Sequence, residues 1–297
     1  MATRYVLGGI KTNVGEIGGI TDVTFDNGIQ AVLNGSGGAV DNTYAAMLYA
    51  EPLLRFTSTD IFACLGQAGI SGTSLSSWIA AFQLATNKGT RTGTWRQLTG
   101  ASALLVPVSI QAAQGREATI EMAVYPIGDA TNAPVGINTS DPSVTQVSAK
   151  KYTLGPLELN TAAIEIQSIR IDMNYQIERR SHSGLPWPTH VNLNMRAPKI
   201  TFTSIDAEKL AAVFGTNEVA ETITALEVWL YKMAEGGAAR VALATEEHIK
   251  FTGTEGIAYM TSMGGSRGGD AVSEYQCDLV YDGSNAVLAF DTTAAIA

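Results

Sequence analysis

The feature that most constrains this chain is an internal repeat. Nine residues from Pro52 to Asp60, PLLRFTSTD, recur 146 positions later as PKITFTSID, from Pro198 to Asp206. Each copy alternates polar and apolar residues as a strand does, and each ends in a Ser-x-Asp sequence that can cap a following helix. We expect the two helices to end at Gly66 and Gly215. The recurrence predicts a repeated structural unit.

Other segments of the chain support the repeat. Val23, Phe25 and Asp26 align with Ile169, Ile171 and Asp172 at the same offset. Later positions align without a gap at an offset of 153, namely Leu98-Thr99-Gly100 with Phe251-Thr252-Gly253, Ser109 with Ser262, Gly115 with Gly268, Ala118 with Ala271, Glu121 with Glu274, Asp129 with Asp282, Asn132 with Asn285 and Ala133 with Ala286. We interpret the chain as two copies of one domain, residues 1–150 and 151–297. The polar segment 134–151, which carries two prolines, is the predicted linker.

The composition is that of a folded protein that meets other proteins. A length of 297 residues suffices for two ordinary cores, and a 45% hydrophobic content with positive mean hydropathy argues against disorder. Charged residues make up only 16%, so we expect much of the surface to contact protein. The net charge of −9 disfavours nonspecific binding to nucleic acid, although solubility alone also explains an acidic balance.

Cysteine usage and the chain terminus indicate an intracellular site of synthesis. Cys64 and Cys277 lie in apolar contexts in different repeats, which favours packing over a disulfide. The N-terminus lacks the apolar core of a signal peptide, and no apolar run approaches the ~20 residues of a membrane span.

Strand patterns dominate both halves. Residues 169–178 alternate as one long strand with a buried and a wet face, and we expect further strands over 20–33 and 44–57. Two hairpins are predicted, over 103–112 with 117–127 and over 256–263 with 271–281. Residues 1–16 are predicted to form a docking arm or a loose terminus. The fold class is therefore mainly β, with two tandem antiparallel β-sandwich or barrel domains that each carry a short α-helix.

Residues with catalytic spacing are lacking. His182, His190 and His248 do not fit a known metal-ligand spacing, and a metal site at His182 and His190 is the alternative interpretation. The glycines of 264–269 lack the lysine and the strand-to-helix context of a phosphate loop, so a hairpin turn is the better interpretation. We therefore expect no catalytic residues, no bound metal and no cofactor. Trp187, between two prolines, either packs within its own loop or anchors a partner.

The order of elements resembles a known family. Two long strands joined by a loop, a short helix and further antiparallel strands resemble the tail tube, or major tail, protein of long-tailed bacteriophages of the siphovirus type. Residues 271–284, AVSEYQCDLVYDGS, and 287–290, VLAF, are similar to the last strands of that family. Single-domain members form hexameric rings that stack around a DNA channel, and two-domain members form trimeric, pseudo-hexameric rings. The resemblance covers the whole chain by pattern, without a diagnostic motif.

This resemblance implies a virion structural protein made in the host cytoplasm and assembled into the tail. Its partners would be further copies of itself as a homotrimer, the tape measure protein, and the tail terminator and tip proteins. Double-stranded DNA would pass through the tube nonspecifically during ejection, and no membrane would be involved. The family has no catalytic residues to transfer.

The resemblance predicts two sets of functional residues. The polar side chains that alternate with apolar ones along the strands are predicted to line the channel, although the same face could instead be an outer wall. These residues are Asp22, Thr24, Asp26, Glu121, Arg170, Asp172, Asn174, Gln176, Glu178, Glu274, Gln276 and Asp278. The loops 34–43 and 179–190 are predicted to contact the next ring through Asn34, Gly35, Ser36, Val40, Asp41, Arg180, His182, Leu185, Trp187 and His190.

Two other classes of protein fit the sequence. One is a two-domain β-sandwich binding module, such as a capsid decoration or tail-tip adaptor protein. The other is a carbohydrate-active or other enzyme on a β scaffold, which would need a cluster of carboxylates with perturbed pKa values.

Overall fold

A computed structural model describes residues 4–34, 41, 44–87, 93–145, 147–182, 184–214, 220–235, 240–265 and 271–296. The protein is mainly β, with 58% strand and 6% helix in several antiparallel sheets, which confirms the predicted fold class. The elements follow in the order β1 Tyr5–Thr12, β2 Glu16–Ile17, β3 Ile20–Asp26, β4 Ile29–Asn34, β5 Tyr44–Ala50, β6 Leu53–Ser58, α1 Ile61–Ala68, β7 Thr73–Leu75, β8 Trp78–Leu84, η1 Ala85–Asn87, β9 Trp95–Gly100, β10 Ala103–Ala113, β11 Thr119–Pro126, β12 Gly136–Asn138, β13 Tyr152–Leu159, β14 Ala162–Ile164, β15 Ile166–Asp172, β16 Tyr175–Arg180, β17 His190–Arg196, β18 Lys199–Ser204, α2 Ala207–Phe214, β19 Glu221–Ile223, β20 Leu226–Lys232, β21 His248–Gly253, β22 Gly256–Gly264, β23 Val272–Leu279 and β24 Ala289–Ala294.

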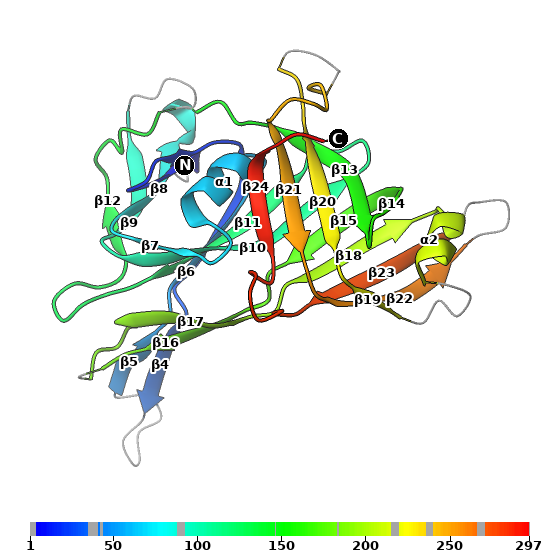
Figure 1. The fold of residues 1–297 in the computed structure, drawn as a ribbon. Helices are drawn as coiled ribbons and strands as arrows, with labels where there is room; N and C mark the ends of the chain where they lie inside the picture. The colour runs from blue at the N-terminus through cyan, green and yellow to red at the C-terminus, as the bar shows by residue number, and fades with distance from the viewer. Residues whose placement is uncertain are drawn as a thin grey trace.

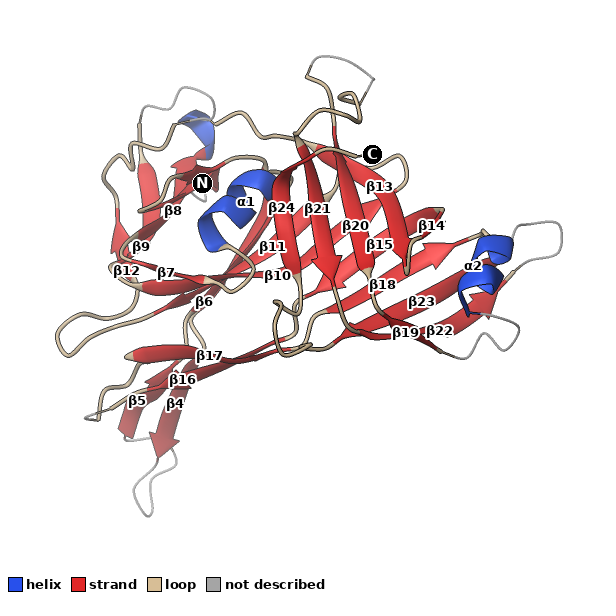
Figure 2. Cartoon of the chain, viewed as in Figure 1, coloured by secondary structure: helices blue, strands red, loops and turns tan. Residues whose placement is uncertain are grey.

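Three larger sheets and two hairpins make up the molecule (Figures 1 and 2). A ten-stranded sheet runs in the order β19-β22-β23-β18-β15-β10-β11-β6-β3, with β7 also paired to β10. Two five-stranded sheets, β12-β9-β8-β1-β2 and β14-β13-β20-β21-β24, pack against it. The hairpins β4-β5 and β16-β17 extend together away from these sheets.

The strand pairing of the first half recurs in the second half. β3 pairs β6, β6 pairs β11 and β11 pairs β10, and the same antiparallel pairs join β15, β18, β23 and β22. The register repeats as well, since Ser109 lies opposite Glu121 and Ser262 lies opposite Glu274, each just after a bulge. The Phe-Thr-Ser stretches are β6 and β18, which occupy equivalent positions.

The repeated Ser-x-Asp sequence performs the same task twice. Ser58 Oγ donates a hydrogen bond to the Gly18 carbonyl and accepts one from the Asp60 amide, while Asp60 Oδ1 caps α1 by accepting from the Ala63 amide at 3.1 Å. Ser204 likewise accepts from the amide of Asp206. The Asp206 carboxylate accepts from the Lys209 amide at the start of α2. The predicted caps are therefore confirmed.

The aligned Asp129 and Asp282 also perform one task twice. Each carboxylate accepts hydrogen bonds from the backbone amide and the side chain of the asparagine three residues later, Asn132 or Asn285. Hydrogen bonds from these asparagines lower the pKa of both aspartates below the usual range. Both turns are thus stabilised by an ionised side chain.

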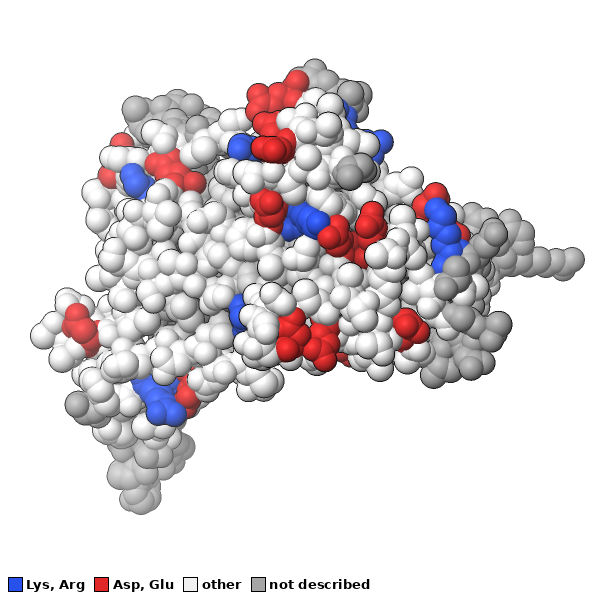
Figure 3. Space-filling view, in the orientation of Figure 1, with Lys and Arg blue, Asp and Glu red and all other residues white. Residues whose placement is uncertain are grey.

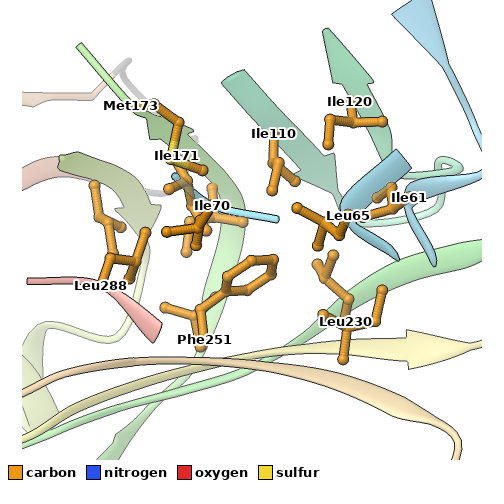
Figure 4. Close-up of a cluster of buried hydrophobic side chains, with 14 of the residues drawn as sticks. Ile61, Leu65, Ile70, Ile110, Ile120, Ile171, Met173, Leu230, Phe251 and Leu288 are labelled. Atoms are coloured by element: carbon orange, nitrogen blue, oxygen red, sulfur yellow. The ribbon is translucent and has the colours of Figure 1, made fainter. Parts of the chain in front are cut away.

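One hydrophobic cluster runs through both halves (Figure 4). Ile110 and Leu65 of the first half share it with Ile171, Leu230 and Phe251 of the second half. The polypeptide therefore builds a shared core instead of two separate ones. Because the ten-stranded sheet also crosses the midpoint, the division into two domains at residue 150 stays a prediction.

Several predicted boundaries are wrong. The strands expected over 20–33, 44–57 and 169–178 each break in two, at 27–28, 51–52 and 173–174. α1 continues through Gly66 to Ala68 and is capped by Gly69, whose φ of 59° suits glycine. Gly215 lies outside the described residues.

The described residues of the N-terminal segment, from residue 4 onward, form neither a loose end nor a docking arm. Residues 5–12 form β1, which pairs β8 and β2 inside a five-stranded sheet.

Candidate functional site

One face of the ten-stranded sheet carries polar side chains on strands of both halves, interrupted by a small apolar cluster of Leu104, Val106 and Ala123. Side chains alternate along each strand, and the registers align polar positions of neighbouring strands. Nine of the predicted channel-lining residues share this face, and all are exposed or half-buried: Asp22, Thr24, Asp26, Glu121, Arg170, Asp172, Glu274, Gln276 and Asp278. The opposite face carries the core side chains, such as Ile171 and Phe202.

Ion pairs on this face partly neutralise an acidic balance. Arg170 Nη2 lies 2.7 Å from Asp172 Oδ1, and Arg55 Nη1 lies 2.9 Å from Glu121 Oε1. Hydrogen bonding to Asp172 raises the pKa of Arg170. The strands of this face carry six carboxylates and three cations, a net charge of −3: Asp22, Asp26, Glu121, Asp172, Glu274 and Asp278 against Arg55, Arg170 and Lys199.

Three predicted lining residues lie elsewhere. The chain leaves the ten-stranded sheet after β15, where Asn174 adopts a φ of 47°. Gln176 and Glu178 consequently belong to β16, which pairs only β17. The polar alternation that extends to residue 178 is real, but it continues on a separate hairpin. The prediction that these three side chains share the face of Asp172 is wrong.

The two halves are joined by one strand pair, β10 with β15. Ser109 lies opposite Asp172, Ile110 opposite Ile171, and the pairing continues to Ala113. This pair makes the sheet continuous, and it brings an edge of the first half onto an edge of the second.

At the repeat offsets, β10 corresponds to β22 and β15 corresponds to β3. Both β22 and β3 have an edge that lacks a strand partner in the described chain. In the described part of the chain, β3 pairs only β6, and β22 beyond Ala258 pairs only β23. At the repeat offsets, Ser262 corresponds to Ser109 and Asp26 corresponds to Asp172. The sheet therefore ends in two strand edges whose equivalents already pair with each other inside the chain.

The β16-β17 hairpin covers the end of the polar face in the first half. Its Ile177 and Leu193 pack against a small apolar cluster that contains Leu104 and Val106. Arg179 donates to the carbonyl of Glu51 at 3.0 Å, and its guanidinium lies 4.7 Å from the centre of the Tyr125 ring. The hairpin is thus fixed to the preceding half.

Trp187 packs within its own chain. Its Nε1 donates to the carbonyl of Asp129 at 3.1 Å, and its ring lies so close to Gly128 that an added Cβ would meet it at 2.5 Å. Trp187 therefore packs on the turn at Gly128 and Asp129 in the first half and not within its own loop, and its role as an anchor for a partner stays a prediction.

The other predicted inter-ring residues lie around the ends of the two hairpins. Arg180, His182, His190 and Asp41 are exposed, and Leu185 is half-buried. Asn34 ends β4, whereas Gly35, Ser36 and Val40 lie outside the described residues. Their contact with a second ring stays a prediction.

The histidines and cysteines of the described residues form no metal cluster. The rings of His182 and His190 meet edge to face with centroids 5.4 Å apart, but no group of three or more His, Cys, Asp or Glu in the described ranges could hold a metal. Burial raises the pKa of Cys277 to about 12 and that of Cys64 further, so both thiols are protonated. On the face that Figure 3 shows, charged side chains are sparse.

Comparisons with known proteins give no identification, because no family model matches the sequence and no curated protein is significantly similar. None of the helices in the described ranges is long and apolar enough to cross a membrane.

Sequence reasoning missed the open edges. Ser262 and Met263 were assigned to a hairpin, yet nothing in their pattern reveals that the far side of β22 is unpaired. The repeat offset was the available signal, and it becomes informative once the pairing of β10 with β15 is seen.

Proposed function

We propose that this chain is a structural protein that associates head to tail with copies of itself, as a two-domain tail tube protein of a long-tailed phage. The observation that carries the proposal is that β3 and β22 have open edges in the described chain, whereas their equivalents, β15 and β10, pair with each other. An unpaired edge exposes amide and carbonyl groups and invites another strand. A contact between unlike surfaces repeats around a ring until it closes, and closure leaves no edge.

The internal pair supplies the geometry of the proposed junction. The proposed junction uses the register of the β10-β15 pair, with each residue replaced by its equivalent at the repeat offset. Ser262 then lies opposite Asp26 of the next copy, and Met263 lies opposite its Phe25. Three chains then contribute six equivalent halves, which matches the trimeric, pseudo-sixfold ring that the family resemblance implies.

The polar face supports a channel function. In a closed ring this face would form one continuous wall, whose balance of six carboxylates and three cations would avoid lasting phosphate contacts. We propose that it lines the DNA path in the phage tail, while the ends of both hairpins contact the next ring. A tape measure protein and terminator and tip proteins would be the other partners in the virion.

A designed disulfide tests the junction. Directly opposed residues in antiparallel strands have Cα atoms ~4.5–5.5 Å apart, within the range that a disulfide spans. Asp26→Cys combined with Ser262→Cys should therefore cross-link copies on oxidation and give a ladder that stops at three chains. The native Cys64 and Cys277 are buried and should not interfere.

Matched variants control this experiment. Each single cysteine variant should give no ladder, and Asp22→Cys with Ser262→Cys should cross-link poorly, because Asp22 lies four residues, ~13 Å, away along the strand. A ladder that ends at six chains would refute the stoichiometry, and equal cross-linking of the out-of-register pair would refute the junction.

A further inference from the structure

The β4-β5 hairpin presents an apolar face that the described chain leaves uncovered. Ile29, Ala31 and Leu33 of β4 lie on it with Ala45 and Met47 of β5, since Ala31 pairs Met47 and Leu33 pairs Ala45. All five residues are exposed, Ile29 by 55% and Leu33 by 60%. Apolar faces of this kind mark contacts with another molecule.

The sister hairpin shows how such a face is covered. At the repeat offset the same positions of β16-β17 are Tyr175, Ile177, Arg179, Val191 and Leu193, and every one of them is half-buried. They pack, Arg179 over the Tyr125 ring, on the first half, where Leu104, Val106 and Ala123 are buried. Two hairpins with the same register thus differ in one respect, the presence of a covering surface.

The equivalent positions exist in the second half, where Ile257 is exposed and Tyr259 is half-buried with its hydroxyl donating to Asp278. The offset of 153 relates Leu104 to Ile257 and Val106 to Tyr259. Ile257 is 45% exposed, and the residues that follow β23, Val280 and Tyr281, are exposed as well. The pair of apolar positions that holds one hairpin in the first half therefore recurs, unoccupied by described residues, in the second.

A chain cannot bring these two surfaces together by itself. The hairpin β4-β5 continues from β3, which ends one side of the ten-stranded sheet, while Ile257 lies on β22 near the other end. Six strands lie between β22 and β3 along the sheet. The occupant must come from a second molecule, and the repeat identifies a second copy of this chain.

We propose that β4-β5 of one copy packs its apolar face on the Ile257 and Tyr259 surface of the next copy, as β16-β17 packs on Leu104 and Val106 within a chain. This inference rests on the proposed head-to-tail assembly and adds a second contact to the same junction. The strand edges set the register, and the hairpin covers apolar surface on the adjacent half. The hairpin ends remain free to extend toward another ring.

A photo-cross-linker tests the occupant. Full-length protein with benzoylphenylalanine in place of Met47 is mixed with isotopically labelled wild-type chains, irradiated and digested. Mass spectrometry should find links between labelled and unlabelled chains at residues 256–261 or 276–281. Ile257→Glu in the labelled partner should reduce the cross-linking yield roughly tenfold or more, because the docked β4-β5 hairpin would bury an unpaired charge.

The control is Ile137→Glu in the labelled partner, which changes an exposed isoleucine on β12 and should leave the yield unchanged. Circular dichroism checks that both glutamate variants fold. Rings or tubes that form with links elsewhere would overturn the hairpin inference and leave the proposed function standing. A protein that does not associate at any concentration, or that links only to unrelated proteins or lipid, would overturn both.

Discussion

Truncating Met263 should weaken assembly without weakening the fold. Met263 is 58% exposed on the open edge of β22, and its equivalent in the first half, Ile110, is fully buried beside Ile171. The proposed junction would bury Met263 against Phe25 of the next copy. Met263→Ala removes that contact, while little packing is lost within one chain.

The size of the effect follows from this exposure. Burying a whole methionine side chain contributes about 1.5–3 kcal/mol, so burying the exposed 58% should contribute about 1–2 kcal/mol at each junction. Three junctions in a ring give about 3–5 kcal/mol, which is roughly a hundred- to several-thousandfold in the equilibrium constant of the ring.

Sedimentation velocity over a concentration series measures the shift, and denaturant unfolding of the dilute protein measures the fold. Ile137→Ala, on a similarly exposed apolar side chain, should change neither. A double-mutant cycle with Phe25→Leu should show coupling in the assembly free energy, since the two side chains would touch. Wild-type assembly by Met263→Ala, or an equal loss from Ile137→Ala, would refute the reasoning.

Further predictions concern the core, the turns, the channel and the loop. Ile171→Ala should lower the free energy of unfolding by about 2–5 kcal/mol in denaturant titrations, because Ile171 is fully buried; a loss below 1 kcal/mol would contradict the shared core. The lowered pKa of Asp282 means that its stabilising contribution is present above the unfolded-state pKa and disappears as the pH falls below about 4; Asp282→Asn should therefore flatten the decline of Tm toward acid pH, and an unchanged slope would count against this. Asp172→Lys with Glu274→Lys should leave tubes intact but slow DNA ejection, less so at high salt; unchanged ejection from intact virions would show that these residues do not line the path. Trp187→Ala should leave the protein folded, loosen residues 184–189 in hydrogen exchange and impair tube growth; normal tubes would remove Trp187 from the contacts between rings.

Local pattern predicted the repeated parts of the fold well. Identities at fixed offsets predicted that 52–60 and 198–206 are equivalent, and the caps at Asp60 and Asp206 follow from short-range chemistry. Alternation of side chains predicted the polar face, because a strand buries one side whatever its partners are.

Non-local pairing and backbone breaks could not be predicted in this way. The pairing of β10 with β15 joins strands of different halves, and neither strand's sequence indicates which strand it pairs with. The break at Asn174 requires a left-handed backbone conformation at that residue. An asparagine within an alternating run does not by itself predict such a conformation. β1 was missed because Gly8 interrupts its pattern, and the structure explains this glycine, since a Cβ would meet the Trp95 ring at 2.5 Å.

The shared core follows from the same long-range pairing. Ile110 and Phe251 belong to different halves of the chain, and their contact in one cluster depends on how the halves join. Composition indicates how much apolar surface the chain must bury, but not whether that surface is buried in one core or in two.

Electron microscopy of the concentrated full-length protein tests the central claim most directly. Negative-stain images should show rings or hollow tubes, and symmetry analysis of those particles should find three chains per ring, with β3 of each chain beside β22 of its neighbour. Particles that remain single chains at high concentration, or rings built from six whole chains, would contradict the account.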